Sequence, residues 1–456
     1  MTAEISSAAP SAGPSEEPVL DEPGPGPLIP PSNTAAASWA LFTGIALLML
    51  GNGLQGSLLG IRSEYEGFST AATGVVMTAY FVGFLAGSRA AIRALTTVGH
   101  IRVFAALASM ASTATLVHAL TITPVTWALM RFTTGLCMAG LYVVAESWIN
   151  DLATNKTRGR LLALYMVVTM GGVAGGQFLL NLADPRGFEL FVIASVLVSL
   201  SLVPTSLSGR SAPPTRVPEP MSISELFSIV PTGLTISALV GMAHGSLLGM
   251  GAVYAARAGL APSQIAIFMG APMVGGVVLQ FPIGTLSDRV PRRGVMFAVA
   301  IGATVSAALL LVAEPAGWVS YLLMFLVGGF SFPLYSLGIA YTNDWIRPEQ
   351  ATGASSSLVT TNGVGAVVGP LLSAGLIVTL GTDMFFVALV VTHGAIAAYL
   401  AYRIAFRDAL PLSRQGRFQP VSSRASTVIA TLASRRRRPG TKQVKGAGGP
   451  TEQTNP

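Results

Sequence analysis

Long apolar runs separated by short polar loops recur along the chain from residue 38 to residue 404. A helix needs about 20 apolar residues to cross roughly 30 Å of hydrocarbon at about 1.5 Å per residue. Twelve segments reach this length. We therefore predict an all-α polytopic membrane protein with twelve transmembrane helices, at residues 38–60, 71–93, 101–121, 124–148, 159–182, 188–207, 229–256, 262–286, 294–313, 317–342, 354–379 and 382–404.

Three polar stretches fall outside these spans. Residues 1–37 are rich in Pro, Ala, Ser and Gly and lack Lys and Arg, so they are predicted to be a disordered tail rather than a signal peptide. Residues 208–228 are the predicted linker between two six-helix halves, at residues 38–207 and 229–404. Residues 405–456 are polar and basic and are predicted to be a second disordered tail.

The basic residues of the loops lie mostly on one side of the predicted membrane. With both termini in the cytoplasm, the inner loops hold 12 Lys and Arg residues and the outer loops hold three, namely Arg62, Arg186 and Arg257. This bias predicts that both termini are cytoplasmic, in a plasma membrane. The net charge of +7 then reflects a basic tail beside anionic lipid, and we expect no nucleic-acid partner.

Composition supports a membrane protein and excludes several kinds of chemistry. Charged residues make up 10% of the chain, against about 25% in soluble proteins, and the mean hydropathy is +0.62. One cysteine and four scattered histidines exclude a disulfide framework and predict no metal site and no cofactor. The chain lacks a phosphate-binding G-x-x-x-x-G-K-[ST] loop and any clustered catalytic groups, so we expect neither ATP hydrolysis nor another enzyme activity.

Short patterns recur in the two halves at a nearly constant offset. Gly-Ser-Leu-Leu-Gly at residues 56–60 recurs at residues 245–249. Two halves in the same orientation follow the parallel-repeat plan of a large transporter class, whose substrate site lies near the midplane between them. Further matches, at offsets of 192 or 193 residues, pair Met77, Ala79, Val82 and Gly83 with Met269, Ala271, Val274 and Gly275, Tyr142 and Asn150 with Tyr335 and Asn343, and Gly172 and Gly176 with Gly365 and Gly369.

Two motifs make a family resemblance specific. Residues 284–293, Gly-Thr-Leu-Ser-Asp-Arg-Val-Pro-Arg-Arg, resemble the G-x-L-x-D-R-x-x-R-R loop of the major facilitator superfamily. Residues 131–135, Arg-Phe-Thr-Thr-Gly, are similar to its R-x-x-x-G motif. The resemblance covers residues 38–404 and implies the twelve-helix fold of that superfamily, with pseudo-symmetric halves and transport by alternating access.

The chain also departs from the superfamily pattern. The loop between the second and third spans has no Asp, so only the C-terminal copy can make the usual Asp contact. Gln177 stands where the antiporter motif G-x-x-x-G-P has its proline. The residues 145–148, Ala-Glu-Ser-Trp, followed by Arg158-Gly159-Arg160, resemble a bacterial branch of facilitators that have no assigned substrate.

Two ionisable residues inside span 4 are candidate coupling groups, because charge within a membrane is costly unless it serves a function. The resemblance associates Arg131 with proton coupling, although an interhelical clasp to backbone carbonyls is an equal alternative. Glu146 shares a helical stripe with Tyr142 and has Ile339 as its counterpart in the other half. It is either a proton carrier or a cytoplasmic gate that pairs with Arg158 and Arg160.

The loop between spans 8 and 9 is a candidate gate. The resemblance implies that it latches the outward-open state, with Asp288 near a helix N-terminus and arginines that bind carboxylates between the halves. A role in membrane orientation alone explains its arginines but neither its glycine nor its aspartate. The predicted latch residues are Gly284, Asp288, Arg289, Arg292 and Arg293.

Polar residues on the spans that surround the predicted cavity are candidate substrate ligands. They are Asn52, Gln55, Tyr142, Gln177, His244, Gln280, Tyr335 and Asn362. Gln55 and His244 occupy the same place in the two copies, so both are expected to face the cavity across the pseudo-twofold axis. His244 is either a titrating ligand or an interhelical hydrogen bonder.

These observations predict a secondary active transporter that moves a small organic solute, with protons as the coupling ion and a monomer as the working unit. The alternative is a membrane sensor or interaction protein that has the transporter fold, has lost transport and signals through its basic tail. The intact loop with Asp288 and the retained Arg131 favour the transporter.

Overall fold

A computed structural model describes residues 31–154, 157–207, 221–407 and 410–418. These residues form helices and contain no strand. The N-terminal half consists of α1 (Pro31–Tyr65), α2 (Thr70–Val98), α3 (His100–Leu120), α4 (Pro124–Leu152), α5 (Arg158–Phe178), η1 (Leu179–Leu182), α6 (Glu189–Leu200) and α7 (Leu202–Leu207). The C-terminal half consists of α8 (Ile223–Ile229), α9 (Pro231–Arg257), α10 (Pro262–Ser287), α11 (Arg292–Leu309), α12 (Trp318–Trp345), η2 (Pro348–Gln350), α13 (Ala351–Leu380), α14 (Met384–Phe406) and η3 (Leu412–Arg414).

The twelve predicted spans correspond to helices of the structure. Eleven helices of the described chain are long and apolar enough to cross a membrane. The sixth predicted span is the shorter apolar stretch Glu189–Pro204, within α6 and α7. These two helices are separated by Ser201 alone, whose backbone stays in the right-handed helical region. The predicted twelve-helix fold is therefore confirmed.

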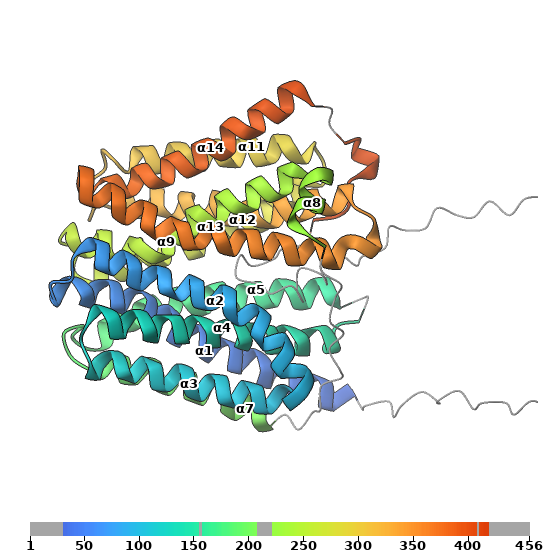
Figure 1. Cartoon of the computed structure of the whole chain (residues 1–456). Coiled ribbons are helices and arrows are strands. Elements are labelled where there is room, and N and C mark those ends of the chain that lie inside the picture. The colour runs from blue at the N-terminus through green and yellow to red at the C-terminus, as the bar shows by residue number, and fades with distance from the viewer. Residues whose placement is uncertain (1–30, 155–156, 208–220, 408–409, 419–456) are drawn as a thin grey trace, which may run out of the picture.

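The two halves pack their helices in the same way. In the N-terminal half α2 packs on α4, α1 on α5 and α6, and α3 on α4 and α6. In the C-terminal half α10 packs on α12, α9 on α13 and α14, and α11 on α12 and α14. The second set repeats the first helix for helix, so the sequence repeat corresponds to a structural repeat. Figure 1 shows the two halves one above the other, with both ends of the described chain at the same end of the bundle.

Paired glycines bring neighbouring helices into backbone contact within each half. A Cβ on Gly83 of α2 would overlap the carbonyl oxygen of Phe132 in α4, and one on Gly135 would overlap that of Tyr80. Gly275 meets the carbonyl oxygen of Phe325 in the same way in the C-terminal half. Small residues permit such approach in membrane helices, where packing rather than hydrophobic burial drives association. The repeated glycines are thus packing positions.

The most extensive contacts between the halves are those of α1 with α9, α2 with α13 and α5 with α10, and α2 also contacts α9. We call the end of the bundle that carries both chain ends the terminus end, and the opposite end the far end. The ribbons of α2 and α13 move apart toward the terminus end (Figure 1).

Three helical segments lie where tails or linker were expected. Helix α1 begins at Pro31, before the expected start of the first span, and α8 occupies the last part of the linker. Residues 410–418 include η3 and pack against the C-terminal half, through contacts described below. The other parts of the predicted tails and linker, residues 1–30, 208–220 and 419–456, lie outside the described residues.

We expect Gly135→Ala to lower the stability of the fold, because its Cβ requires α2 and α4 to separate. Overpacking of this kind costs about 1–3 kcal/mol. The thermal unfolding midpoint of the purified protein should therefore fall. Gly171→Ala is the matched control, because no heavy atom lies within 4 Å of its Cβ position. Equal midpoints for the two variants would contradict the packing role of Gly135.

Candidate functional site

The far end of the interface between the halves is closed. Gly60 of α1 packs against Ala252 of α9. A Cβ atom on Gly60 would lie 3.0 Å from the Ala252 Cβ. Arg257 at the end of α9 donates from Nε to Glu64 Oε2 of α1 over 2.8 Å. The two side chains of this pair are mostly buried, with 26% and 17% of their surfaces exposed. An ion pair therefore joins the halves at this end.

A small pocket lies between the halves, where α2, α9 and α13 meet. Its cavity volume is about 40 Å³, which leaves room for a few water molecules. A drug-sized ligand does not fit into this space. Aromatic and aliphatic side chains dominate the wall, which includes Tyr80, Phe81, Phe84, His244, Val359 and Asn362.

Two of the predicted substrate ligands line this pocket. His244 is 4% exposed, and its ring lies 4.7 Å from that of Phe332, measured between centroids. Asn362 is also buried and donates from Nδ2 to the carbonyl oxygen of Ser237 over 3.1 Å. The pocket thus combines an apolar wall with an imidazole and an amide.

Three other predicted ligands make hydrogen bonds to neighbouring helices of their own half. Gln55 donates to Thr115 Oγ1 of α3 over 3.1 Å, and Gln280 donates to Ser336 Oγ of α12 over 2.8 Å. Gln177 accepts a hydrogen bond from the Ser57 hydroxyl and donates to the Gly53 carbonyl oxygen, both in α1. Unlike His244, Gln55 is directed to α3, so the structure does not bring the two together at the pocket.

Arg131 lies behind the pocket wall. Its guanidinium carbon is 4.4 Å from the centre of the Tyr80 ring, a cation–π contact, and the residue is 4% exposed. The Tyr80 hydroxyl donates to Asn52 Oδ1 over 3.4 Å. A polar chain therefore runs from Arg131 through Tyr80, which lines the pocket, to the predicted ligand Asn52.

Glu146 is fully buried near the terminus end of α4. Its Oε1 accepts a hydrogen bond from the Tyr165 hydroxyl of α5 over 2.7 Å. Tyr142, one turn earlier, donates to the sulfur of Met49 over 2.9 Å. Tyr335 of α12 is also buried and lies within electrostatic reach of Glu146. Glu146 of one half therefore lies near a tyrosine of the other half.

The predicted gate partners of Glu146 lie at the start of α5. Arg160 is exposed, and the side chain of Arg158 lies outside the described part of the structure. Pairing of Glu146 with these two arginines therefore stays a prediction.

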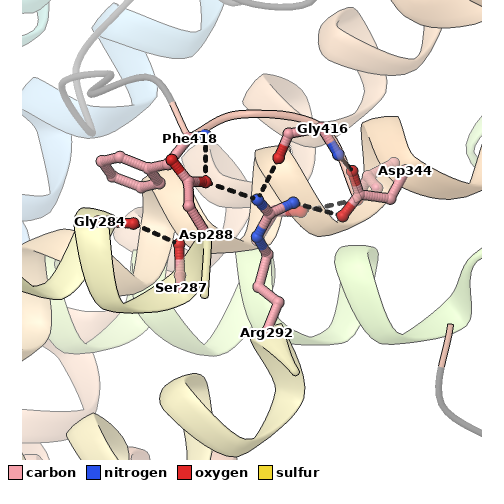
Figure 2. Close-up of polar contacts among 9 residues, drawn as sticks. Gly284, Ser287, Asp288, Arg292, Asp344, Gly416 and Phe418 are labelled. Carbon is pink, nitrogen blue, oxygen red and sulfur yellow. Dashed lines mark hydrogen bonds and ion pairs between the residues drawn. The ribbon is translucent and has the colours of Figure 1, made fainter. Parts of the chain in front are cut away.

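The motif loop between α10 and α11 makes its described contacts with the C-terminal half (Figure 2). Arg292 is 1% exposed, forms an ion pair with Asp344 of α12 and lies 3.5 Å from Asp288. Arg293 donates to the carbonyl oxygens of Arg403 and Arg407 at the end of α14 over 2.7 and 3.0 Å. These contacts join the terminus-end tips of α10, α11, α12 and α14.

The other latch residues differ in exposure. Arg289 is exposed, whereas Gly284 is buried on α10. Asp288 accepts a hydrogen bond from the backbone of Phe418. The described contacts of Arg292 and Arg293 are with the C-terminal half, and the latch across the halves stays a prediction.

Several residues at these contacts were not predicted from the sequence. Glu64 could have been found, because it is an acidic residue at the outer end of the first span and Arg257 is one of the three basic residues predicted in the outer loops. Tyr165 has no such signal, because its spacing to Glu146 depends on the turn between α4 and α5. The contact of Phe418 with the motif loop could not be predicted, because Phe418 lies in a polar tail without apolar periodicity.

The described residues contain no group of three or more His, Cys, Asp or Glu that could hold a metal ion. The buried polar groups instead form hydrogen bonds and ring contacts around an apolar pocket. This arrangement suits the binding of a solute rather than chemical conversion.

Comparison with known proteins identifies the family. A family model described as Major Facilitator Superfamily matches residues 41–328 and 233–440. The uncharacterized MFS-type transporter YcaD of Escherichia fergusonii is 25% identical over 353 residues, which cover 76% of this chain and 90% of that protein. The Escherichia coli YcaD is 26% identical over the same shares.

Solved structures show the same fold. The nucleoside transporter NupG superposes with a TM-score of 0.64 at 13% identity, covering 82% of this chain and 98% of that one. A bacterial homolog of the human lysosomal transporter Spinster, inward-facing and unoccupied, gives 0.63 at 17% identity, covering 90% and 100%. With its membrane-spanning helices and a pocket between two repeated halves, this chain is a multi-pass membrane transporter rather than an enzyme, and it belongs to the Major Facilitator Superfamily.

Proposed function

We propose that the chain is a secondary active transporter that moves a small organic solute by alternating access and uses protons as the coupling ion. A single chain is the working unit, since one chain supplies both halves. It lies in the bacterial inner membrane with the terminus end in the cytoplasm, a direction supported by the excess of basic residues in the loops at that end. The far end then faces outward.

The observation that carries the proton coupling is the buried carboxyl of Glu146 near the interface of the halves. Burial disfavours the charged form of a carboxyl, and contact with water favours it. Movement of the halves during the transport cycle changes the contact of Glu146 with water, and a proton is released or taken up with that change. In the described state the hydroxyl of Tyr165 holds the carboxyl in place.

The pocket wall supports a solute with an apolar ring or chain and few polar groups. Tyr80, Phe81 and Phe84 offer aromatic surface, and the side chains of His244 and Asn362 are the polar groups in the wall opposite these rings. Such sites bind mainly through apolar contact, and a few polar groups fix the orientation of the ligand. Because the space is small in this state, the solute enters when the halves move apart.

Glu146→Gln is expected to abolish accumulation driven by a pH gradient, because an amide cannot carry the proton. Exchange of labelled for unlabelled solute should continue, because it needs no net proton movement. The measurement uses proteoliposomes and a panel of small aromatic solutes, selected by the rise in unfolding temperature that binding causes.

Glu189→Gln is the matched control for this experiment, because Glu189 is an exposed carboxyl at the start of α6. It should leave both accumulation and exchange at the level of the unmodified protein. Accumulation that survives in full in Glu146→Gln would rule out Glu146 as the proton carrier.

Arg257→Glu is expected to favour opening of the far end, because it replaces the ion pair with Glu64 by repulsion. A partly exposed pair is worth about 1 kcal/mol, or about fivefold in the conformational equilibrium. A cysteine at Ala252, with Cys137 replaced by Ala, should then react faster with a hydrophilic maleimide. Exchange of the two charges, Glu64→Arg with Arg257→Glu, should restore the slow rate. A fast rate in the exchanged pair would argue against the ion pair as a gate.

A further inference from the structure

A short segment near the end of the described chain docks on the motif loop. We call residues 415–418 the strap. The Gly416 carbonyl oxygen accepts from Arg292 Nη2 over 2.8 Å, and its N–H donates to Asp344 Oδ1 over 2.7 Å. The Phe418 N–H donates to Asp288 Oδ1 over 2.7 Å. Figure 2 shows the strap lying across the three charged side chains.

The side chain of Phe418 covers Gly284 of α10. A Cβ at Gly284 would overlap the Phe418 ring, so the ring lies directly on the glycine surface. The strap therefore uses two neighbouring features of the motif loop at once, namely the bare backbone of Gly284 and the carboxylate of Asp288.

The covered face of α10 is the face that meets the N-terminal half at the far end. Gly270 lies 14 residues before Gly284, so the two positions are about 40° apart around the helix. A Cβ at Gly270 would lie 3.6 Å from the ring of Phe178, which belongs to α5 of the other half. At the far end this face of α10 thus holds an aromatic ring of α5, whereas at the terminus end it holds Phe418.

The matching position on α5 is uncovered. Helices α5 and α10 run in opposite directions, so the residue that corresponds to Gly284 lies about 14 residues before Phe178, at Leu164. Leu164 is 43% exposed. The geometry places Phe418 where the terminus-end part of α5 would pack if the two halves closed there.

We propose that the strap is an intramolecular wedge that holds the terminus end of the transporter open and must leave Gly284 and Asp288 before that end closes. This inference rests on the alternating access proposed above. It makes the C-terminal segment a brake on the transport cycle, because each cycle requires the wedge to detach from the loop.

The wedge is tested by two point variants and two truncations of the full chain, in nanodiscs. Phe418→Ala and removal of residues 411–456 both remove the aromatic ring that packs on Gly284. Phe406→Ala and removal of residues 419–456 are the matched controls, because Phe406 is an aromatic residue that is 71% exposed at the end of α14 and the shorter truncation keeps the strap.

The first readout is labelling of a cysteine at Ala252, in the protein whose Cys137 is replaced by Ala. Loss of the wedge should let the terminus end close and the far end open, so the labelling rate of the cysteine should rise about tenfold. This is the shift expected when the favoured state loses the burial of one Phe ring. Both controls should stay at the rate of the unmodified protein. Rates for Phe418→Ala and the longer truncation that equal those of the controls would overturn the wedge.

The second readout is amide hydrogen exchange in the unmodified protein. The N–H groups of Gly416 and Phe418 donate to carboxylates, so peptides that contain them should exchange more slowly than a free chain. Exchange at the free-chain rate would overturn docking of the strap. Arg257→Glu separates the two proposals: if it speeds labelling while the strap variants do not, alternating access stands and the wedge fails. If no variant speeds labelling, both fail.

Discussion

Backbone contact between helices at glycine is the constraint on which the rest of the structure depends. Within each half, pairs such as Gly83 with Phe132 and Gly275 with Phe325 leave no room for even one methyl group. In lipid, where apolar side chains gain nothing by leaving the solvent, such close packing and the hydrogen bonds that it permits hold helices together. Each half is therefore a rigid body. Between the halves, close contacts at Gly60 and Gly74 are joined by the ion pair of Glu64 and Arg257.

Two identical halves would give a fully symmetric transporter. Positions at which the two halves differ are therefore the candidates for coupling and gating. Glu146 is a fully buried carboxyl and has Ile339 as its counterpart. Asp288 has no counterpart in the loop between α2 and α3. In the proposed cycle, one half provides the group that exchanges a proton, and the other half provides a loop that is held or released. A transport cycle needs both functions, but neither has to be present twice.

The sequence predicted most of the fold because its signals are local or periodic. The twelve apolar runs follow from bilayer thickness, and the matched glycines follow from a duplicated packing pattern. The site was less predictable. Gln55, Gln177 and Gln280 were equally plausible as ligands, yet their amides bond to neighbouring helices. Which way a polar side chain points depends on the rotation of its helix, and a helix that is apolar on all sides gives no periodic signal of that rotation. The strap escaped prediction because a contact of Phe418 with Gly284 and hydrogen bonds to Asp288, Arg292 and Asp344 determine it, rather than hydrophobic periodicity.

The engagement of these amides also bears on how a solute could be selected. The amide of Gln177 already donates and accepts hydrogen bonds, so it gives little affinity, because the solute must break one bond to form another. The pocket wall then offers aromatic rings, the imidazole of His244 and the amide of Asn362, which donates to Ser237 but keeps its oxygen available to a donor. Discrimination among solutes has to come from the shape of the apolar part and from one or two polar contacts. If the proposed site binds the solute, we expect it to reject highly charged solutes through the cost of desolvating them and to accept a range of weakly polar ones.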